Sequence, residues 1–221
     1  MARGSATRMV ARHEIRQELE RRILSGETKA GERLSQQSLA RELGVAQGTV
    51  RESLLELQWL GLVESIDHLG VFVEKLDVNR ICEAYMLREV LEGLAARLAC
   101  QNAGRADIAE LRAMADQILK LAENDDAETA TVDRRFHLRI IEMARNSTLK
   151  RLSQTYRPLG MTVRAYREPS MIHAEHLRIV DAIEHNFPEE AERQARAHVV
   201  GAREMLEKLD QEGKFVPQWA K

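Results

Sequence analysis

One carboxylate and three histidines stand at spacings from which a metal site could be built. Asp133 and His137 are four residues apart, so they share a face if this segment is helical. His176 and His198 follow, 22 residues apart, each within a segment of helical character. Neutral imidazole binds zinc, nickel and other first-row divalent ions well, and a carboxylate adds compensating charge. If these side chains converge, they predict a metal centre, and zinc, nickel and manganese all remain admissible.

The segment from Asp77 onward has a helical hydrophobic pattern throughout. Polar, Gly and Pro-containing breaks divide it into six expected helices, which are 77–102, 105–123, 127–145, 147–167, 171–186 and 188–213. Pro188 suits the first turn of the last helix, and Pro158 predicts a kink in the fourth. The second part of the chain is therefore expected to be all α-helical.

The N-terminal third has a different order of elements. Apolar spacing predicts a first helix through Leu24, a second from an N-cap at Ser35 to Leu43, and a third over 47–60. Residues 62–66 and 71–73 then predict a short β-hairpin. This order is typical of a winged helix-turn-helix, in which one helix enters the major groove of DNA.

These patterns divide the chain into five parts. Residues 1–9 are expected to form a disordered leader, 10–75 the winged helix-turn-helix and 76–79 a linker. The helical domain is expected over 80–213, followed by a tail over 214–221. The predicted fold class is therefore mainly α, with two domains.

Composition excludes several classes of protein. The formal net charge is −2, so any DNA contact must come from a local basic face rather than from overall charge. Two cysteines, Cys82 and Cys100, indicate neither a zinc ribbon nor a disulfide framework. The sequence has no secretory signal and no apolar run long enough to span a bilayer, so we expect a cytoplasmic protein without membrane association.

The first domain resembles the GntR family of bacterial regulators. The residues that carry the resemblance are Gly31-Glu32-Arg33-Leu34, Leu39-Ala40, Leu43-Gly44-Val45, Val50-Arg51-Glu52, Leu54, Leu57, Gly61-Leu62-Val63 and the wing Gly70-Val71-Phe72-Val73. The resemblance implies that double-stranded operator DNA is the partner. It places DNA contacts at Arg33, Gln37, Gln47, Thr49, Arg51 and Gly70.

The start of the expected recognition helix departs from the family's usual Ser-Arg-Thr-Pro. Here it is Ala46-Gln47-Gly48-Thr49, so the N-cap serine is missing, a loss of about 1 kcal/mol. Gln47 replaces an arginine, and glutamine favours adenine, which predicts a different operator. An alternative is that Arg41 and Arg51 are ordinary surface residues paired with neighbouring glutamates.

The second domain resembles the ligand-binding domain of the FadR subfamily, of the FCD type. The matching segments are 85–99, 133–141, 175–183 and 195–198. The resemblance implies a six- or seven-helix antiparallel bundle around a divalent metal ion bound by Asp133, His137, His176 and His198. His173 shares a helix face with His176 and is the main alternative ligand.

The resemblance also implies a small carboxylate effector bound at the metal. Arg88 is the first candidate to pair with it, because guanidinium binds carboxylate through two parallel hydrogen bonds. Tyr85 and Arg134 are further candidates, with these side chains as alternatives: Arg139, Tyr156, Arg157 and Arg164.

The sequence thus predicts a homodimeric, metabolite-responsive transcriptional regulator, expected to be a repressor and not an enzyme. Two alternatives stay open. One is a helical metal-dependent hydrolase, which would need a general base beside the metal-bound water. The other is a DNA-binding protein whose metal is purely structural.

Overall fold

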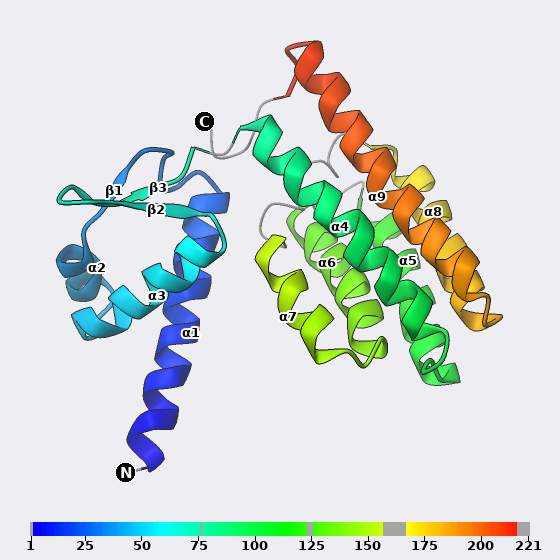
Figure 1. The fold of residues 1–221 in the computed structure, drawn as a ribbon, viewed down its shortest axis with the longest axis horizontal. Helices are drawn as coiled ribbons and strands as arrows, with labels where there is room; N and C mark the ends of the chain where they lie inside the picture. Colours follow the sequence, from blue (N-terminus) through cyan, green and yellow to red (C-terminus); the bar gives the residue numbers. More distant parts are fainter. Residues whose placement is uncertain (1, 76, 123–125, 157–166, 216–221) are drawn as a thin grey trace. The chain divides into compact units, whose positions relative to one another are not determined.

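The computed structural model describes residues 2–75, 77–122, 126–156 and 167–215. The chain divides into two compact units, with the boundary between Asp77 and Val78 (Figure 1). We call the first the reading unit and the second the helical unit. None of the described helices is both long and apolar enough to cross a membrane.

The reading unit combines three helices with a small sheet. Its elements are, in order, α1 Ala2–Leu24, β1 Arg33–Leu34, α2 Gln36–Glu42, α3 Gln47–Trp59, β2 Val63–Ile66 and β3 Gly70–Val73. Helix α3 packs on α1 and α2 through Val50, Leu54 and Leu57, which are almost fully buried. The Ser53 hydroxyl donates a hydrogen bond to the Arg12 carbonyl at 3.0 Å and so ties α3 to α1. The predicted winged helix-turn-helix is confirmed.

The two helix starts in this unit differ. The Ser35 side chain accepts a hydrogen bond from the Ser38 amide at 3.3 Å and caps α2, as predicted. Ala46 is the N-cap of α3 and makes no side-chain cap bond. Gly44, at φ 65°, forms the turn between the helices in a backbone region that suits glycine.

Two features of this unit differ from expectation. The sheet has three strands in the order β1-β3-β2, because β1 adds to the expected hairpin with Arg33 opposite Phe72. A two-residue strand is too short to produce a periodic pattern, so the sequence did not indicate it. Residues 2–9, expected to be a disordered leader, continue helix α1; this stretch lacks proline and contains good helix formers.

The helical unit contains six helices within its described residues. They are α4 Val78–Ala99, α5 Arg105–Leu121, α6 Asp126–Met143, α7 Ser147–Tyr156, α8 Pro169–Glu184 and α9 Pro188–Gln211. Prolines occupy the first turn of α8 and α9, where the missing amide proton costs nothing. The expected kink at Pro158 lies outside the described residues.

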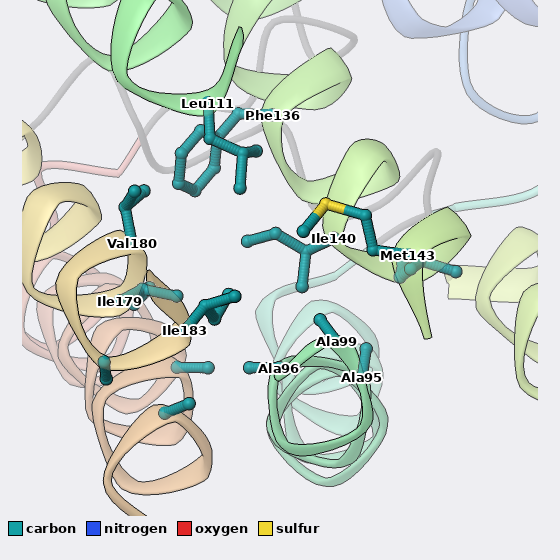
Figure 2. Packing of buried hydrophobic residues seen from close by; sticks show 14 of the residues in the cluster. Ala95, Ala96, Ala99, Leu111, Phe136, Ile140, Met143, Ile179, Val180 and Ile183 are labelled. Atoms are coloured by element: carbon teal, nitrogen blue, oxygen red, sulfur yellow. The ribbon is translucent and has the colours of Figure 1, made fainter. Parts of the chain in front are cut away.

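Helices α4 and α9 run antiparallel and pack along most of their lengths (Figure 1). Helix α8 packs on both α5 and α9, and α6 packs on α4 and α5. Small residues of α4, Ala95, Ala96 and Ala99, face larger side chains from the other helices (Figure 2). Those side chains are Leu111, Phe136, Ile140, Met143, Ile179, Val180 and Ile183. This packing fixes the relative positions of the helices that carry the predicted ligands.

Candidate metal centre

The three predicted ligand histidines meet inside the helical unit, from helices α6, α8 and α9. One ring nitrogen from each of His137, His176 and His198 lies within 4.8 Å of the others. His176 is completely buried, His198 is 6% exposed, and the His137 side chain is 11% exposed. Histidines 22 to 61 residues apart in the sequence therefore form one buried cluster.

Asp133 completes this cluster, one helical turn before His137. Its Oδ1 is 3.6 Å from His176 Nε2, and its Oδ2 is 3.9 Å from His137 Nε2. Both Nε2 atoms are buried and have no hydrogen-bond partner among the described residues. A buried nitrogen left unsatisfied is costly, and a cation at this point would satisfy both. Ligands about 2.1 Å from one ion lie about 3 to 4 Å apart, so these residues fit a divalent metal after small movements.

Two glutamates that sequence reasoning missed hold the outer nitrogens of two of these histidines. Glu92 Oε2 lies 2.9 Å from His137 Nδ1, and Glu175 Oε2 lies 2.7 Å from His198 Nδ1. Two features of the sequence could have indicated these glutamates: Glu92 follows Arg88 by one helical turn, and Glu175 directly precedes His176. Carboxylates that contact the outer nitrogen of a histidine commonly orient metal ligands.

Each of these glutamates is also paired with a buried arginine. Arg88 Nε donates to Glu92 Oε1 at 2.7 Å, and Arg167 Nη2 donates to Glu175 Oε1 at 2.7 Å. Arg88 also lies 5.0 Å from the centre of the Tyr85 ring. Arg167 was missed because it is the last residue of the expected helix 147–167, directly before a break, where no packing pattern indicated its orientation. The centre therefore contains two equivalent chains of hydrogen-bonded side chains. One is Arg88–Glu92–His137 and the other is Arg167–Glu175–His198.

A glycine of α9 makes room for the second arginine. A Cβ atom at Gly201 would lie 3.2 Å from Arg167 Nη2, closer than most contacts of a real Cβ. An alanine at this position would therefore press on the guanidinium that binds Glu175.

The electrostatics of the cluster favour the neutral forms of His176 and His198 and the ionised forms of the two glutamates. Burial lowers the pKa of His176 far below its usual value, and the nearby His198 and His137 lower it further. Burial also lowers the pKa of His198, although the hydrogen bond with Glu175 opposes this effect. Burial alone would raise the pKa of Glu92, but the charge of Arg88 and the hydrogen bonds with His137 and Arg88 outweigh it and depress the pKa strongly. Neutral imidazole is the form that binds metals.

His176 is held differently from the other two histidines. Its ring stacks on Phe136 with the ring centres 4.2 Å apart and the planes at 24°. Neither of its nitrogens has a hydrogen-bond partner among the residues described. Aromatic packing rather than a carboxylate therefore orients this ring.

The remaining histidines lie away from the cluster. His173 Nε2 lies 2.9 Å from Asp116 Oδ1, so the main alternative ligand is engaged at the surface between α8 and α5. His185 Nδ1 contacts the Asp181 carbonyl at 2.8 Å. His13 and His68 are exposed in the reading unit.

The expected effector residues divide into two groups. Tyr85 and Arg88 are buried near the cluster, and burial raises the pKa of Tyr85 to about 12. Arg134 has an exposed side chain and Arg139 is paired with Asp107 and Glu110, so the structure does not bring either into the cluster. Arg157 and Arg164 lie outside the described residues, as does the side chain of Tyr156.

A small cavity lies beside His137. Its volume is about 10 Å³, and its walls include Glu92, Ala95, Ile140 and Ile179. This is about the space that one water molecule requires. An organic acid could not enter this cavity unless the residues around it moved.

In the reading unit, most of the expected DNA contacts lie at the surface. Arg33, Gln37, Gln47 and Arg51 are exposed. Thr49 differs, because its side chain is 6% exposed inside the unit; the side chain expected to contact DNA is therefore turned inward. This burial follows from its position one turn before the buried Ser53, whose hydroxyl donates to the Thr49 carbonyl at 3.0 Å.

Gly70, the expected DNA contact in the wing, lies beside the side chain of Arg33. Gly70 has φ 115°, and a Cβ atom there would lie 3.1 Å from Arg33 Nε. Glycine thus allows both the backbone conformation of the wing and the close approach of the arginine side chain.

The surface arginines of this unit differ in their partners. Glu42 pairs with Arg22, and Glu52 pairs with Arg12, so neither glutamate pairs with its neighbour Arg41 or Arg51. Arg33, Arg41 and Arg51 make no ion pair with any residue that the structure describes. Three exposed cations thus remain available to bind phosphate or base edges.

Comparison with known proteins covers both units. Residues 11–73 match the family "Bacterial regulatory proteins, gntR family", and residues 83–201 match the FCD domain. The chain is 31% identical over 198 residues to the "Probable D-xylose utilization operon transcriptional repressor" of Paenarthrobacter nicotinovorans, covering 87% of each protein. It is 27% identical over 230 residues to the Glc operon transcriptional activator of Escherichia coli strain K12, covering 90% of each.

Solved structures give the same fold. The match to E. coli McbR/YncC has a TM-score of 0.74 at 22% identity, covering 90% of this chain and 98% of that one. A GntR-type regulator from Rhodococcus sp. RHA1 matches with a TM-score of 0.69 at 22% identity, covering 89% and 97%. With both units matched in this order, the chain belongs to the GntR family of DNA-binding transcriptional regulators, in the FadR subfamily with an FCD domain, and is not an enzyme.

Proposed function

We propose that this regulator responds to a metabolite, and that a small carboxylate bound at a metal centre controls its affinity for operator DNA. Asp133, His137, His176 and His198 would hold the ion. The observation that supports this most strongly is the buried cluster in which two Nε2 atoms lack partners and lie beside one carboxylate. The ion, when bound, would supply a positive charge with open coordination positions.

The charges around the cluster support an anionic effector. Around the cluster lie two buried arginines, each paired with a glutamate, and one further carboxylate, Asp133. With three carboxylates and two guanidinium groups, these side chains together contribute one net negative charge. A divalent cation would change this to one net positive charge. Because an uncompensated buried charge is costly, a monoanionic ligand would be favoured. Zinc, nickel and manganese remain the candidate ions.

Arg88 and Tyr85 are the residues that we propose to contact the effector from α4. Both are buried and lie on the same side of the cluster as Glu92. Since Arg88 already binds Glu92, an effector carboxylate would share this guanidinium rather than meet an unpaired one.

We propose that the DNA contacts come from the exposed Arg33, Gln37, Gln47 and Arg51, with Gly70 shaping the wing. A protein with two-fold symmetry matches a two-fold operator, so we propose a homodimer. Helix α4 supports this with an exposed apolar stripe in which side chains recur at helical spacing. The stripe consists of Met86, Leu87, Val90 and Leu94, from 37% to 57% exposed.

We propose that the protein represses transcription and that binding of the effector relieves this repression. The relatives include one named as a repressor and one named as an activator. By linkage, an effector that weakens DNA binding must itself bind less tightly to the DNA-bound protein. Operator affinity measured with and without the effector therefore determines the sign.

Native mass spectrometry of the protein purified from its own cells tests the proposal. We expect a dimer that carries one metal ion per chain and a small additional mass, which would identify the effector. His198→Ala should lose the metal and the added mass, whereas His173→Ala, a matched histidine outside the cluster, should keep both. Unchanged metal content in His198→Ala would refute the site.

A second measurement separates a sensor from a structural metal. Operator affinity would be measured with the metal-loaded protein before and after the effector is removed. A change in affinity supports the sensor. If chelation lowers the melting temperature while the effector leaves operator affinity unchanged, the metal is only structural.

A further inference from the structure

Two glutamates and two arginines surround the histidine cluster in a repeated arrangement. Glu92 of α4 joins Arg88 to His137 of α6, and Glu175 of α8 joins Arg167 to His198 of α9. All four of these side chains are largely buried, at 5% to 14% exposure. Such an arrangement is unnecessary for packing, because buried ion pairs are seldom better than apolar residues.

We propose that Glu92 and Glu175 are positioning residues for the metal ligands, and that Arg88 and Arg167 hold them in place. This inference rests on the proposed metal site. An ionised carboxylate can only accept hydrogen bonds, so the nitrogen that contacts it must carry the proton. Nδ1 of His137 and of His198 therefore carries a proton, and in the neutral form of the ring, which is the form that binds metals, Nε2 then has a free lone pair.

The position of the free nitrogen agrees with this assignment. His137 Nε2 is buried without a hydrogen-bond partner and lies 3.9 Å from Asp133 Oδ2. A protonated nitrogen in this place would be an unsatisfied donor, whereas a lone pair can bind an ion. Each glutamate thus selects the tautomer and also fixes the ring angle through a contact of 2.7 or 2.9 Å.

The arginines have a separate role in these chains. Without Arg88, two carboxylates, Glu92 and Asp133, would lie near His137 and no cation would balance them. Each arginine places a positive charge beside its glutamate, and its hydrogen bond at 2.7 Å occupies Oε1, whereas the histidine contacts Oε2. His176 lacks such a chain and relies on Phe136, so the two types of support can be compared within one centre.

The test uses the full-length chain with Glu92→Gln and Glu175→Gln. The first readout is the tautomer of each histidine in the metal-free protein, measured by long-range ¹H–¹⁵N correlation of the imidazole nitrogens. We expect Glu92→Gln to raise the Nε2-protonated fraction at His137 only, and Glu175→Gln to raise it at His198 only. His176 should not change in either variant.

The second readout is the affinity for Zn²⁺ alone, measured by competition with a chelating dye. Each variant should bind Zn²⁺ about 10- to 100-fold more weakly than the unmodified chain. The control is Glu192→Gln, because Glu192 pairs with Arg97 and Arg196 between α4 and α9 and contacts no histidine of the cluster. It should leave both the tautomers and the affinity unchanged.

A double variant covers the case in which Glu92→Gln does not fold because Arg88 is left unpaired. Arg88→Met together with Glu92→Gln removes both charges of the buried pair and still deprives His137 of its carboxylate. If the unmodified chain does not bind Zn²⁺, the proposed metal site fails. If it binds Zn²⁺ and the variants keep the same tautomers, the positioning inference fails even where affinity falls.

Discussion

Arginine serves opposite purposes in the two units of this regulator. In the reading unit, Arg33, Arg41 and Arg51 are exposed and have no ion pair among the described residues, while nearby glutamates pair with arginines of α1. In the helical unit, Arg88 and Arg167 are buried, and each is bound to a glutamate. The first group can bind an external anion, whereas the second group orders the interior.

The difference shows that the partners of a charged side chain indicate its role better than its type does. An exposed guanidinium loses little when its partner is absent, because water solvates it. A buried guanidinium requires an anion, and removing either member leaves an uncompensated charge. Substitutions in the two groups should therefore affect different measurements.

Arg88→Ala should have the largest effect, about 3 to 5 kcal/mol in the free energy of unfolding, because Glu92 would remain buried without its cation. Urea denaturation of the metal-free protein measures this loss. Arg97→Ala is the control on the same helix, since Arg97 is 41% exposed and its pairs are partly solvated. Equal losses in the two variants would contradict the distinction between buried and exposed arginines.

Removal of the proposed metal ion should have the second largest effect on stability. At a free metal concentration of 100 times Kd, binding stabilises the folded state by about 2.7 kcal/mol, and a chelator removes this contribution. Amide hydrogen exchange should show lost protection in α6, α8 and α9 and unchanged protection in α2 and α3. His198→Ala should show no response to the chelator. If the chelator also lowered protection in the reading unit, the prediction that metal removal affects only the helical unit would be wrong.

Arg51→Ala should weaken operator binding by about 1 to 3 kcal/mol without changing the stability of the fold. Fluorescence anisotropy with an operator fragment selected from genomic DNA measures the affinity. Arg21→Ala is the control, because Arg21 is exposed but already paired with Glu18 and Glu27 on α1 and in the loop after it. If both variants bind DNA equally well, the unpaired arginines have no special role.

The smallest effect is expected from Ala46→Ser, about 1 kcal/mol of added stability, since α3 lacks a side-chain cap. Ser35→Ala should cause a loss of similar size, because Ser35 does cap α2. Thermal unfolding of both variants compares the two helix starts within one unit. A loss of stability in Ala46→Ser would show that the serine disturbs the turn before α3.

The fold was largely predictable because each helix carries its own periodic pattern and each break contains Gly, Pro or Asn. The strand β1 was not predictable, since its pairing with β3 depends on residues nearly 40 positions away. The helical residues 2–9 were also missed, because polar, Arg-rich ends resemble disordered leaders in composition.

The candidate centre was predictable only in its innermost part. Histidines are rare in this chain, and the resemblance to the FCD domain selected three of seven together with Asp133. Glu92 and Glu175 could not be distinguished in the same way, because glutamate is common on helices. Their roles depend on contacts between α4 and α6 and between α8 and α9, and only the packed structure provides those contacts. The inward orientation of Thr49 was missed for the same reason.

Gly201 has a consequence for anyone who wishes to make this regulator more heat-resistant. Glycine inside a helix costs about 1 kcal/mol relative to alanine, so Gly201→Ala is among the first changes that protein engineers would choose. The added methyl group would press on the guanidinium of Arg167 and disturb its bond to Glu175. The gain in helix stability would therefore be offset by strain on this buried ion pair, and the proposed metal centre would lose part of the support that Glu175 gives to His198.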